Sequence, residues 1–214
     1  MLRSLIAVAS VLTGALLLGA CGGDDDEGGG DTSIADLTSQ LAAADDLGLR
    51  LQRETDWDNA TDLLAQGLVI PDGTRPSELG AAIEDAGFQA AVGGELADSR
   101  HNVRIVAAQF DSEEGAVETR EALHEEDLKQ PCAEACVVAP VEYELDEIPD
   151  SAAVHHVPVK TDLPQGLGGV EAHHAEFVIG PQLYVVQVDG RPSSTFSAEF
   201  DELMQTVYEA ASSG

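Results

Sequence analysis

Two histidine doublets are the residues of this chain whose types and spacing could do chemistry. His155-His156 and His173-His174 lie in extended, apolar-rich segments on either side of a turn region at 161–169. If that turn joins two antiparallel strands, residues whose numbers add up to about 330 face each other, which sets His156 across from His174. Facing side chains lie about 5 Å apart at Cβ, so the two imidazoles could share a zinc, copper or nickel ion.

The metal interpretation depends on the register of the strands. Neighbouring residues of a strand point to opposite faces, so one histidine of each doublet can join a given site, with Glu171 or Glu176 as a further ligand. A shift of one residue in register would remove the site. The alternative is that these histidines are solvated or partly packed side chains without a ligand. A response to pH near neutrality is compatible with the same residues.

Carboxylates are abundant, and Glu142, Glu144, Asp146 and Glu147 follow one another along a single run. General acid and base catalysis needs two carboxyls whose environments separate their pKa values, and the sequence indicates no such pair. The chain has no nucleophile elbow, phosphate-binding loop, dinucleotide fingerprint or zincin helix. We therefore predict a protein without catalytic residues and without a cofactor, and keep a hydrolase with an unrecognised carboxylate pair as an alternative.

One cysteine lies near the N-terminus at the end of an apolar run. Leu18-Gly19-Ala20-Cys21 closes this run, which begins after Arg3, and the pattern resembles the bacterial lipoprotein signal. The run is too short for a membrane-spanning helix, which needs about 20 residues. The resemblance implies cleavage before Cys21, a diacylglycerol on its sulfur, and a protein held by this lipid on the extracytoplasmic face of the cell membrane.

The other two cysteines, Cys132 and Cys136, lie close together between a helical and an extended pattern. If Cys21 is acylated, they form an even pair in a compartment that permits disulfides, and we predict a bridge between them. Other interpretations are a redox pair, or a metal site that includes His124. Redox pairs more often have two intervening residues, and a structural zinc needs four ligands, so a structural disulfide is favoured.

The charge balance is strongly acidic, with 40 Asp and Glu against 10 Lys and Arg and a formal net charge of −30. Nucleic-acid-binding proteins need a basic face to displace counterions, so we expect no nucleic acid partner. The same charge is repelled by an anionic membrane surface. Attachment to the membrane would therefore rest on the lipid of Cys21 and not on electrostatics.

The chain divides into three parts by composition. Residues 1–20 are the expected signal peptide, and residues 21–32 are an acidic, glycine-rich tether that cannot bury apolar surface. Residues 33–214 have an ordinary hydrophobic content and suffice for a single domain with its own core.

The first part of this domain is expected to be helical. Apolar residues recur at helical spacing over 34–44, and two further short helices are expected at 59–67 and 77–86. The alternation of Leu47, Leu49 and Leu51 fits a short strand or a continued helix.

The second part is expected to alternate strands with helices. A hairpin is predicted over 88–110, followed by a helix that Asp111 and Glu114 cap and that runs to about Lys129. A final helix from about Thr195 to Ala211 carries an apolar face that docks on the sheet. Between these helices we expect strands at 137–145, 153–160, 170–179 and 183–188.

These elements predict an α+β fold, in which an antiparallel sheet has its helices packed on one face and is preceded by a helical N-terminal part. The order strand, turn, strand, helix occurs over 88–129 and again over 170–211. Two ββα units, which an internal duplication could have produced, are therefore a further expectation.

Beyond the signal, three segments resemble cell-envelope lipoproteins of actinobacteria: Val69 to Gly73, Ile148 to Ala152 and Phe177 to Tyr184. Those proteins look like the extracellular sensor domains of membrane kinases from the same phylum. The resemblance covers residues 60–212 and implies a binding or sensing module of unknown ligand, with no catalytic residues to transfer.

We therefore expect a lipid-anchored, non-enzymatic envelope protein. Its domain would bind a small apolar or envelope-derived ligand, or another surface protein, between the sheet and the helices. Extracytoplasmic metal binding through His156 and His174, and hydrolysis, are the two alternatives.

Overall fold

The computed structural model describes residues 48–68, 75–128, 141–143, 145, 147–149, 151–156, 171–190 and 196–213. Cys21, Cys132 and Cys136 lie outside these ranges, as do the expected signal peptide, the tether and the helix at 34–44, so all of these stay predictions. The elements in chain order are β1 (Arg50–Trp57), α2 (Ala60–Asp62), the π-helix η2 (Leu63–Gly67), α3 (Pro76–Asp85), β2 (Phe88–Ala97), β3 (His101–Phe110), α4 (Glu113–Leu128), β4 (Val141–Tyr143), β5 (Ala152–His156), β6 (Glu171–Ile179), β7 (Gln182–Gly190) and α5 (Phe196–Ser212).

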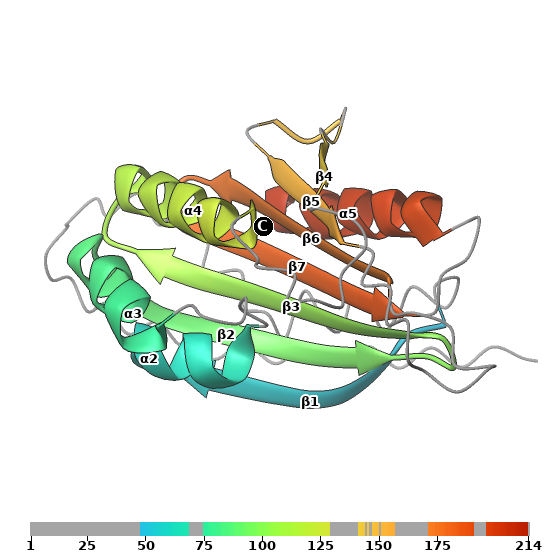
Figure 1. Ribbon diagram of the computed structural model, residues 1–214, viewed down its shortest axis with the longest axis horizontal. Coiled ribbons are helices and arrows are strands. Elements are labelled where there is room, and N and C mark those ends of the chain that lie inside the picture. Colours follow the sequence, from blue (N-terminus) through green and yellow to red (C-terminus); the bar gives the residue numbers. More distant parts are fainter. Residues whose placement is uncertain are drawn as a thin grey trace, which may run out of the picture.

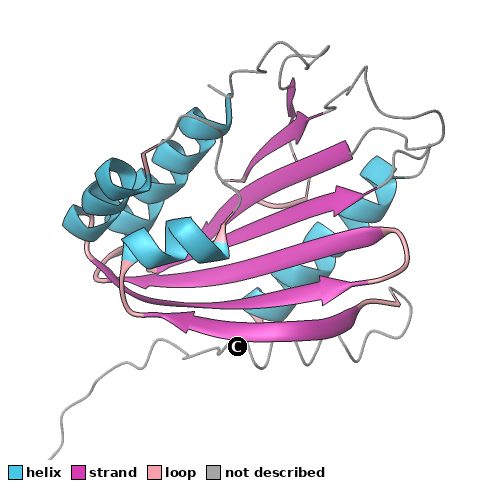
Figure 2. Cartoon of the chain, turned by 60° about the horizontal axis from the view of Figure 1, so that its bottom comes forward, coloured by secondary structure: helices cyan, strands magenta, loops and turns pink. Residues whose placement is uncertain are grey.

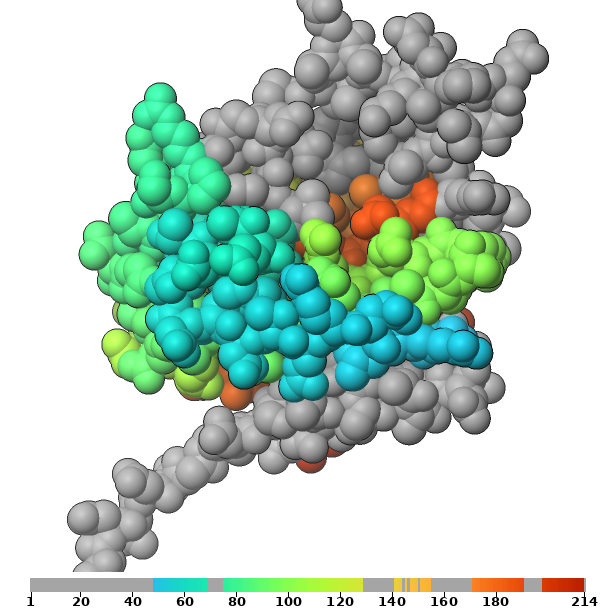
Figure 3. All heavy atoms as spheres, turned by 90° about the horizontal axis from the view of Figure 1, so that it is seen from below, coloured from blue at the N-terminus to red at the C-terminus, as the bar shows by residue number. Residues whose placement is uncertain are grey.

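The seven strands form one sheet in the order β1-β2-β3-β7-β6-β5-β4 (Figure 1). Every neighbouring pair is antiparallel. Strands close in sequence pair within each half, and the two halves meet where β3 pairs with β7 in the centre. β1 forms one edge, and residues 48–67 run across the lower side of the molecule (Figure 3).

Apolar side chains cover both faces of the central strands. Val103 and Ile105 of β3 belong to one core cluster, whereas Val106 and Ala108 belong to a second one. Successive side chains of a strand point to opposite faces, so the two clusters lie on the two sides of the sheet. The first cluster includes residues of α5, and the second includes residues of α2, η2, α3 and α4, so that helices flank the sheet on both sides (Figure 2).

The α+β class and the antiparallel sheet are confirmed, but the helices cover two faces and not the single face that we predicted. The reason is visible in the two central strands. Residues 103–110 and 183–188 are almost continuously apolar, which is typical of strands that are buried on both faces. A strand with one solvated face would alternate apolar and polar residues instead.

The two predicted ββα units are present as β2-β3-α4 and β6-β7-α5, and they meet at the β3–β7 pair. If the two units were related by a two-fold axis that is normal to the sheet and passes between β3 and β7, both helices would lie on the same face. Because α4 and α5 lie on opposite faces, the two units have opposite handedness. The arrangement therefore does not support a simple internal duplication.

The elements at 59–67 and 77–86 are helical as predicted, and η2 continues α2 with π-helical geometry. Leu51 lies in β1, so the strand alternative for the alternating leucines holds there. Trp57, at the end of β1, is buried beside Gly93 of β2. A Cβ atom at Gly93 would lie 2.6 Å from the indole, so the glycine leaves room for this ring.

The start of α4 differs by one residue from the prediction. The Ser112 hydroxyl accepts a hydrogen bond from the Gly115 N–H at 3.2 Å, so Ser112, and not Asp111, caps the helix. Asp111 instead ties the helix start to the sheet, because its own N–H donates to the Gly87 carbonyl at 2.9 Å and its carboxylate accepts from Gln89. Among the helices of the described residues, none is both long and apolar enough to cross a bilayer.

Candidate functional site

A hollow of about 240 Å³ lies between the first turns of α5 and the end of the sheet that carries the β2–β3 turn. Its lining comes from three parts of the fold: α5, the strands β3 and β7 with the turn before β3, and the residues before β1. The lining residues are Leu49, Asp98, Arg100, His101, Val103, Val188, Glu199, Phe200, Glu202 and Leu203.

The hollow has an apolar floor. Val103 of β3 and Val188 of β7 face each other in register, and Phe200 of α5 belongs to the same core cluster. In the next row of the sheet, Gly190 of β7 pairs with His101 on one side and with Glu171 of β6 on the other. Gly190 therefore lies between these two polar residues in one row across the sheet.

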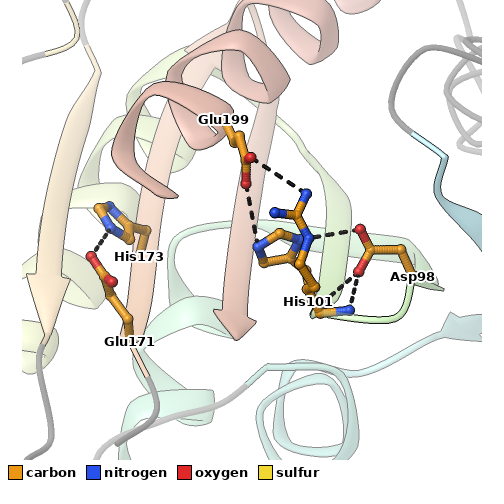
Figure 4. Close-up of polar contacts among 6 residues, drawn as sticks. Asp98, His101, Glu171, His173 and Glu199 are labelled. Atoms are coloured by element: carbon orange, nitrogen blue, oxygen red, sulfur yellow. Dashed lines mark hydrogen bonds and ion pairs between the residues drawn. The ribbon is translucent and has the colours of Figure 1, made fainter. Parts of the chain in front are cut away.

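The rim of the hollow is a network of ionic contacts between the β2–β3 turn and α5 (Figure 4). His101 lies between two carboxylates: its Nδ1 is 3.2 Å from Asp98 Oδ2, and its Nε2 is 3.5 Å from Glu199 Oε2. Glu199 also accepts from the Arg100 guanidinium at 3.4 Å. Glu199 is therefore the residue through which α5 holds the turn.

Asp98 shapes the turn that carries this network. Its Oδ1 accepts from the backbone N–H groups of Arg100 and His101, each at 2.6 Å. Burial alone would raise the pKa of Asp98, but these two hydrogen bonds and the contact with the His101 ring together lower it. The Asp98 carboxylate thus stays ionised and keeps the His101 ring oriented toward α5.

A second histidine lies on the same face of the sheet, one strand beyond β7. His173 is 1 % exposed, and its Nδ1 lies 2.9 Å from the Tyr143 hydroxyl while its Nε2 lies 3.4 Å from Glu171 Oε1. The centre of its ring lies 4.9 Å from that of Phe200, which separates it from the hollow. Burial, and then the charge of Asp201, raise the pKa of Tyr143, so this phenol is a neutral hydrogen-bonding group.

The geometry favours binding of a small molecule with an apolar body and a polar end. The acids that line the hollow range from partly buried to exposed: the side chains of Asp98 and Glu199 are 18 % and 35 % exposed, and Glu202 is exposed. An acid–base pair needs two different and partly desolvated environments. The buried acids Asp127, Glu171 and Glu176 are not among the lining residues of this hollow.

A second hollow, of about 460 Å³, lies farther along α5. It shares Glu202 with the first, and only two of its lining residues are apolar. The lining residues are Leu145, Glu147, Ile148, Asp201, Glu202, Gln205 and Thr206. With less apolar surface and no strand in its lining, it is a poorer candidate for an apolar ligand.

The fold has a known counterpart. The structure is similar to the extracellular domain of PknH from Mycobacterium tuberculosis, with a TM-score of 0.54 and 10 % identity, over 87 % of this chain and all of that one. This likeness shows a shared fold, and at that level it agrees with the predicted resemblance to extracellular domains of actinobacterial kinases.

An uncharacterised protein from Mycobacterium smegmatis matches 85 % of the chain and 97 % of its own length, with a TM-score of 0.43 and 14 % identity, and we infer nothing from it. No protein-family model matches the chain, and no curated protein matches it.

The structure corrects the predicted register of the histidine doublets. His155 faces His173, His156 faces Ala172, and His174 faces Val154, so His156 and His174 are not opposite each other. The strands pair around residue 164, which is one residue earlier than the centre of the turn region suggested. Moving the centre of the turn by one residue moves each partner by two, so each residue of β5 faces a residue of β6 two positions earlier than predicted.

His174 has a different partner from the predicted one. It is 4 % exposed, and its Nδ1 lies 3.2 Å from Asp127 Oδ2 on α4. Among the residues that the structure describes, no group of three or more His, Cys, Asp or Glu side chains could hold a metal ion. Of the acidic run, Glu142 is exposed on β4 and contacts His124 at 3.1 Å.

The residues that form the rim were not singled out from the sequence. The segment Asp98-Ser99-Arg100-His101 reads as an ordinary polar turn, although an Asp that begins a tight turn commonly accepts from the N–H groups that follow it. That pattern could have identified Asp98. No local sequence pattern could have predicted the contact with Glu199, because that residue lies about 100 positions later in the chain.

Proposed function

We propose that this chain is an extracytoplasmic, non-enzymatic binding module whose ligand is a small amphipathic molecule held in the hollow beside α5. The observation that carries the proposal is the combination of an apolar floor, at Val103, Val188 and Phe200, with a preorganised polar rim. Small-molecule sites are typically mostly apolar with a few fixed polar groups that orient the ligand. The volume of about 240 Å³ suits a small ligand or one arm of a larger one.

The absence of catalysis is part of the proposal. The ionisable groups of the rim contact each other, and the buried acids Asp127 and Glu176 lie on the other face of the sheet. The fold shared with a kinase's extracellular domain is compatible with a role in ligand recognition. The sequence around Cys21 supports attachment to the outer face of the membrane through an N-terminal lipid.

A ligand screen by thermal shift tests the proposal. The chain without residues 1–21 is heated alone and with panels of short lipids, fatty acids, fatty alcohols and glycans. A ligand present at 100 times its Kd should stabilise the protein by about 2.7 kcal/mol, a clear rise in Tm. Absence of any shift across these panels would contradict the proposal.

Two leucines provide a matched pair of variants that places the ligand. Leu49 lines the hollow, whereas Leu51, two residues later, is 41 % exposed and outside it. Leu49→Trp should fill the hollow and abolish the ligand-induced shift, and Leu51→Trp should leave the shift unchanged. Equal shifts in both variants would place the ligand elsewhere on the protein.

A further inference from the structure

A cluster of buried ionisable side chains lies on the other face of the sheet, under the C-terminal half of α4. The buried stripe of this helix passes through Thr119 and Leu123 and ends at Asp127, which is 5 % exposed. Beneath it, β6 presents His174 and Glu176, which are 4 % and 1 % exposed. An amphipathic helix normally packs apolar residues against a sheet, and a buried carboxyl at this position is costly unless other groups compensate for its desolvation.

The contacts within the cluster join the two elements. Asp127 Oδ2 lies 3.2 Å from His174 Nδ1, and His124 Nδ1 lies 3.9 Å from Glu176 Oε2. The carboxyl of Asp127 thus lies beside a histidine of β6, and the carboxyl of Glu176 lies beside a histidine of α4. Within the described part of the chain, Glu176 Oε2 is buried without a hydrogen-bond partner.

The surroundings of Glu176 favour its protonated form. An ionised carboxylate only accepts hydrogen bonds, and Oε2 of Glu176 has no hydrogen-bond partner among the described residues. Asp127, in contrast, has the ring of His174 at 3.2 Å. Glu176 is the more deeply buried of the two, and transfer of its charge from water is the more costly.

The groups that face Glu176 come from two elements. From α4 these are Arg120, His124 and Asp127, and from its own strand it is His174. The residues paired with Glu176 on the neighbouring strands are Ala152 of β5 and Val185 of β7, which carry no charge. Glu142 of β4 reaches the cluster only through the other nitrogen of His124, at 3.1 Å.

We propose that Glu176 and Asp127 form a buried proton-binding site, which holds the C-terminal half of α4 on the sheet while the proton is bound. When the proton leaves, two anions face each other in a desolvated seam, and the attachment of α4 weakens. The site is separate from the hollow beside α5, because it lies on the opposite face of the sheet.

The electrostatics agree with the geometry. Burial raises the pKa of Glu176 well above its ordinary value, the charge of Asp127 and the hydrogen bond with it raise it further, and the charge of Arg120 opposes them. The folded chain therefore keeps this proton at pH values where the unfolded chain has lost it. The corresponding stability is complete below the unfolded-state pKa of about 4.3 and is lost as pH rises through the folded-state pKa.

Thermal unfolding of the full-length protein as a function of pH tests the site. The protein is purified in a neutral detergent, and melting is followed by circular dichroism from pH 4.5 to 8.5 with a chelator present, so that no bound metal contributes. The variants are Glu176→Gln and, as the matched control, Glu118→Gln, which removes a carboxylate from the exposed side of the same helix.

Between pH 5 and pH 8, Glu176→Gln should gain roughly 3–5 °C in Tm relative to the wild type, since the amide keeps the shape and cannot ionise. Glu118→Gln should follow the wild-type profile. Parallel profiles for the wild type and Glu176→Gln would overturn the proposal.

If Glu176→Gln fails to fold, hydrogen exchange of the wild-type protein tests the proposal instead. After correction for the intrinsic exchange rate, protection of residues 113–128 in α4 should fall from pH 5.5 to pH 8, while α5 keeps its protection. An equal dependence on pH in both helices would exclude a site that is specific to α4.

Discussion

Glu199 of α5 lies against His101 of β3, with 3.5 Å between Oε2 and Nε2, and this contact links the final helix to the β2–β3 hairpin. The same carboxylate accepts from Arg100 at 3.4 Å, so two side chains of one turn meet a single acid of the helix. Because these residues also line the hollow, the contact fixes both the helix and the rim of the candidate site.

Replacement of Glu199 by Ala should weaken the rim without unfolding the domain. The Glu199 side chain is 35 % exposed, so loss of its ion pairs should lower the free energy of unfolding by only about 0.5–1 kcal/mol. Urea denaturation measures this change. Glu209→Ala, at an exposed position of the same helix, is the control and should change stability less. A loss above 3 kcal/mol would mean that Glu199 has a structural role beyond these pairs.

Asp98 should contribute stability that depends on pH. Its pKa is lowered in the folded state, so its contribution is present above the unfolded-state pKa of about 3.9 and is lost as pH falls through the folded-state pKa. Asp98→Asn keeps an acceptor oxygen and loses the charge. We expect it to be about 1–2 kcal/mol less stable than the wild type at pH 7, with the difference shrinking as the pH falls below the unfolded-state pKa. A difference that stays constant across this range would contradict the assignment.

The local elements could be predicted because their signals are local. The hairpin of β2 and β3 follows from two apolar runs around a polar turn, and α5 follows from an apolar stripe at helical spacing that ends in Val207 and Ala211. The antiparallel sheet followed from the short connections. These inferences needed only neighbours within about 20 residues along the chain.

The candidate site could not be predicted, because it depends on pairings between distant segments. The floor at Val103 and Val188 forms only because β3 pairs with β7, two strands that are far apart in the sequence. The position of the helices on two faces also follows from the placement of β3 and β7 in the centre. The predicted partner of His156 was wrong for a related reason, because a shift of one residue in a turn changes every facing pair of the two strands.

Gly115→Ala should be strongly destabilising. A Cβ atom at this position in the first turn of α4 would lie 1.9 Å from the carbonyl oxygen of Ala86, which follows α3. Backbone cannot move away as a flexible side chain can, so we expect a loss of about 3 kcal/mol or more. Glu114→Ala, at the exposed neighbouring position, should stay within about 0.5 kcal/mol of the wild type in the same denaturation experiment. Similar curves for the two variants would mean that α4 shifts freely.

Cys132 and Cys136 should form a disulfide in the exported protein. Alkylation under non-reducing conditions, followed by mass spectrometry, should find neither thiol free. The bridge closes a very small loop, so the Cys132→Ser, Cys136→Ser double variant should lose about 2 kcal/mol of stability, less than a long-loop disulfide would give. Quantitative alkylation of both cysteines in the untreated protein would exclude the bridge.

Cys21→Ala should release the protein from the membrane, because the sulfur of Cys21 is the predicted site of the diacylglycerol and the acidic chain has no electrostatic attraction to anionic lipids. The experiment is fractionation of cells that express either form, with mass spectrometry of the mature N-terminus. The wild type should sediment with membranes and carry a lipid on residue 21, whereas Cys21→Ala should lack the lipid. Ser33→Ala, beyond the tether, is the control and should fractionate like the wild type. An unmodified Cys21 in a membrane-bound wild type would show that attachment has another cause.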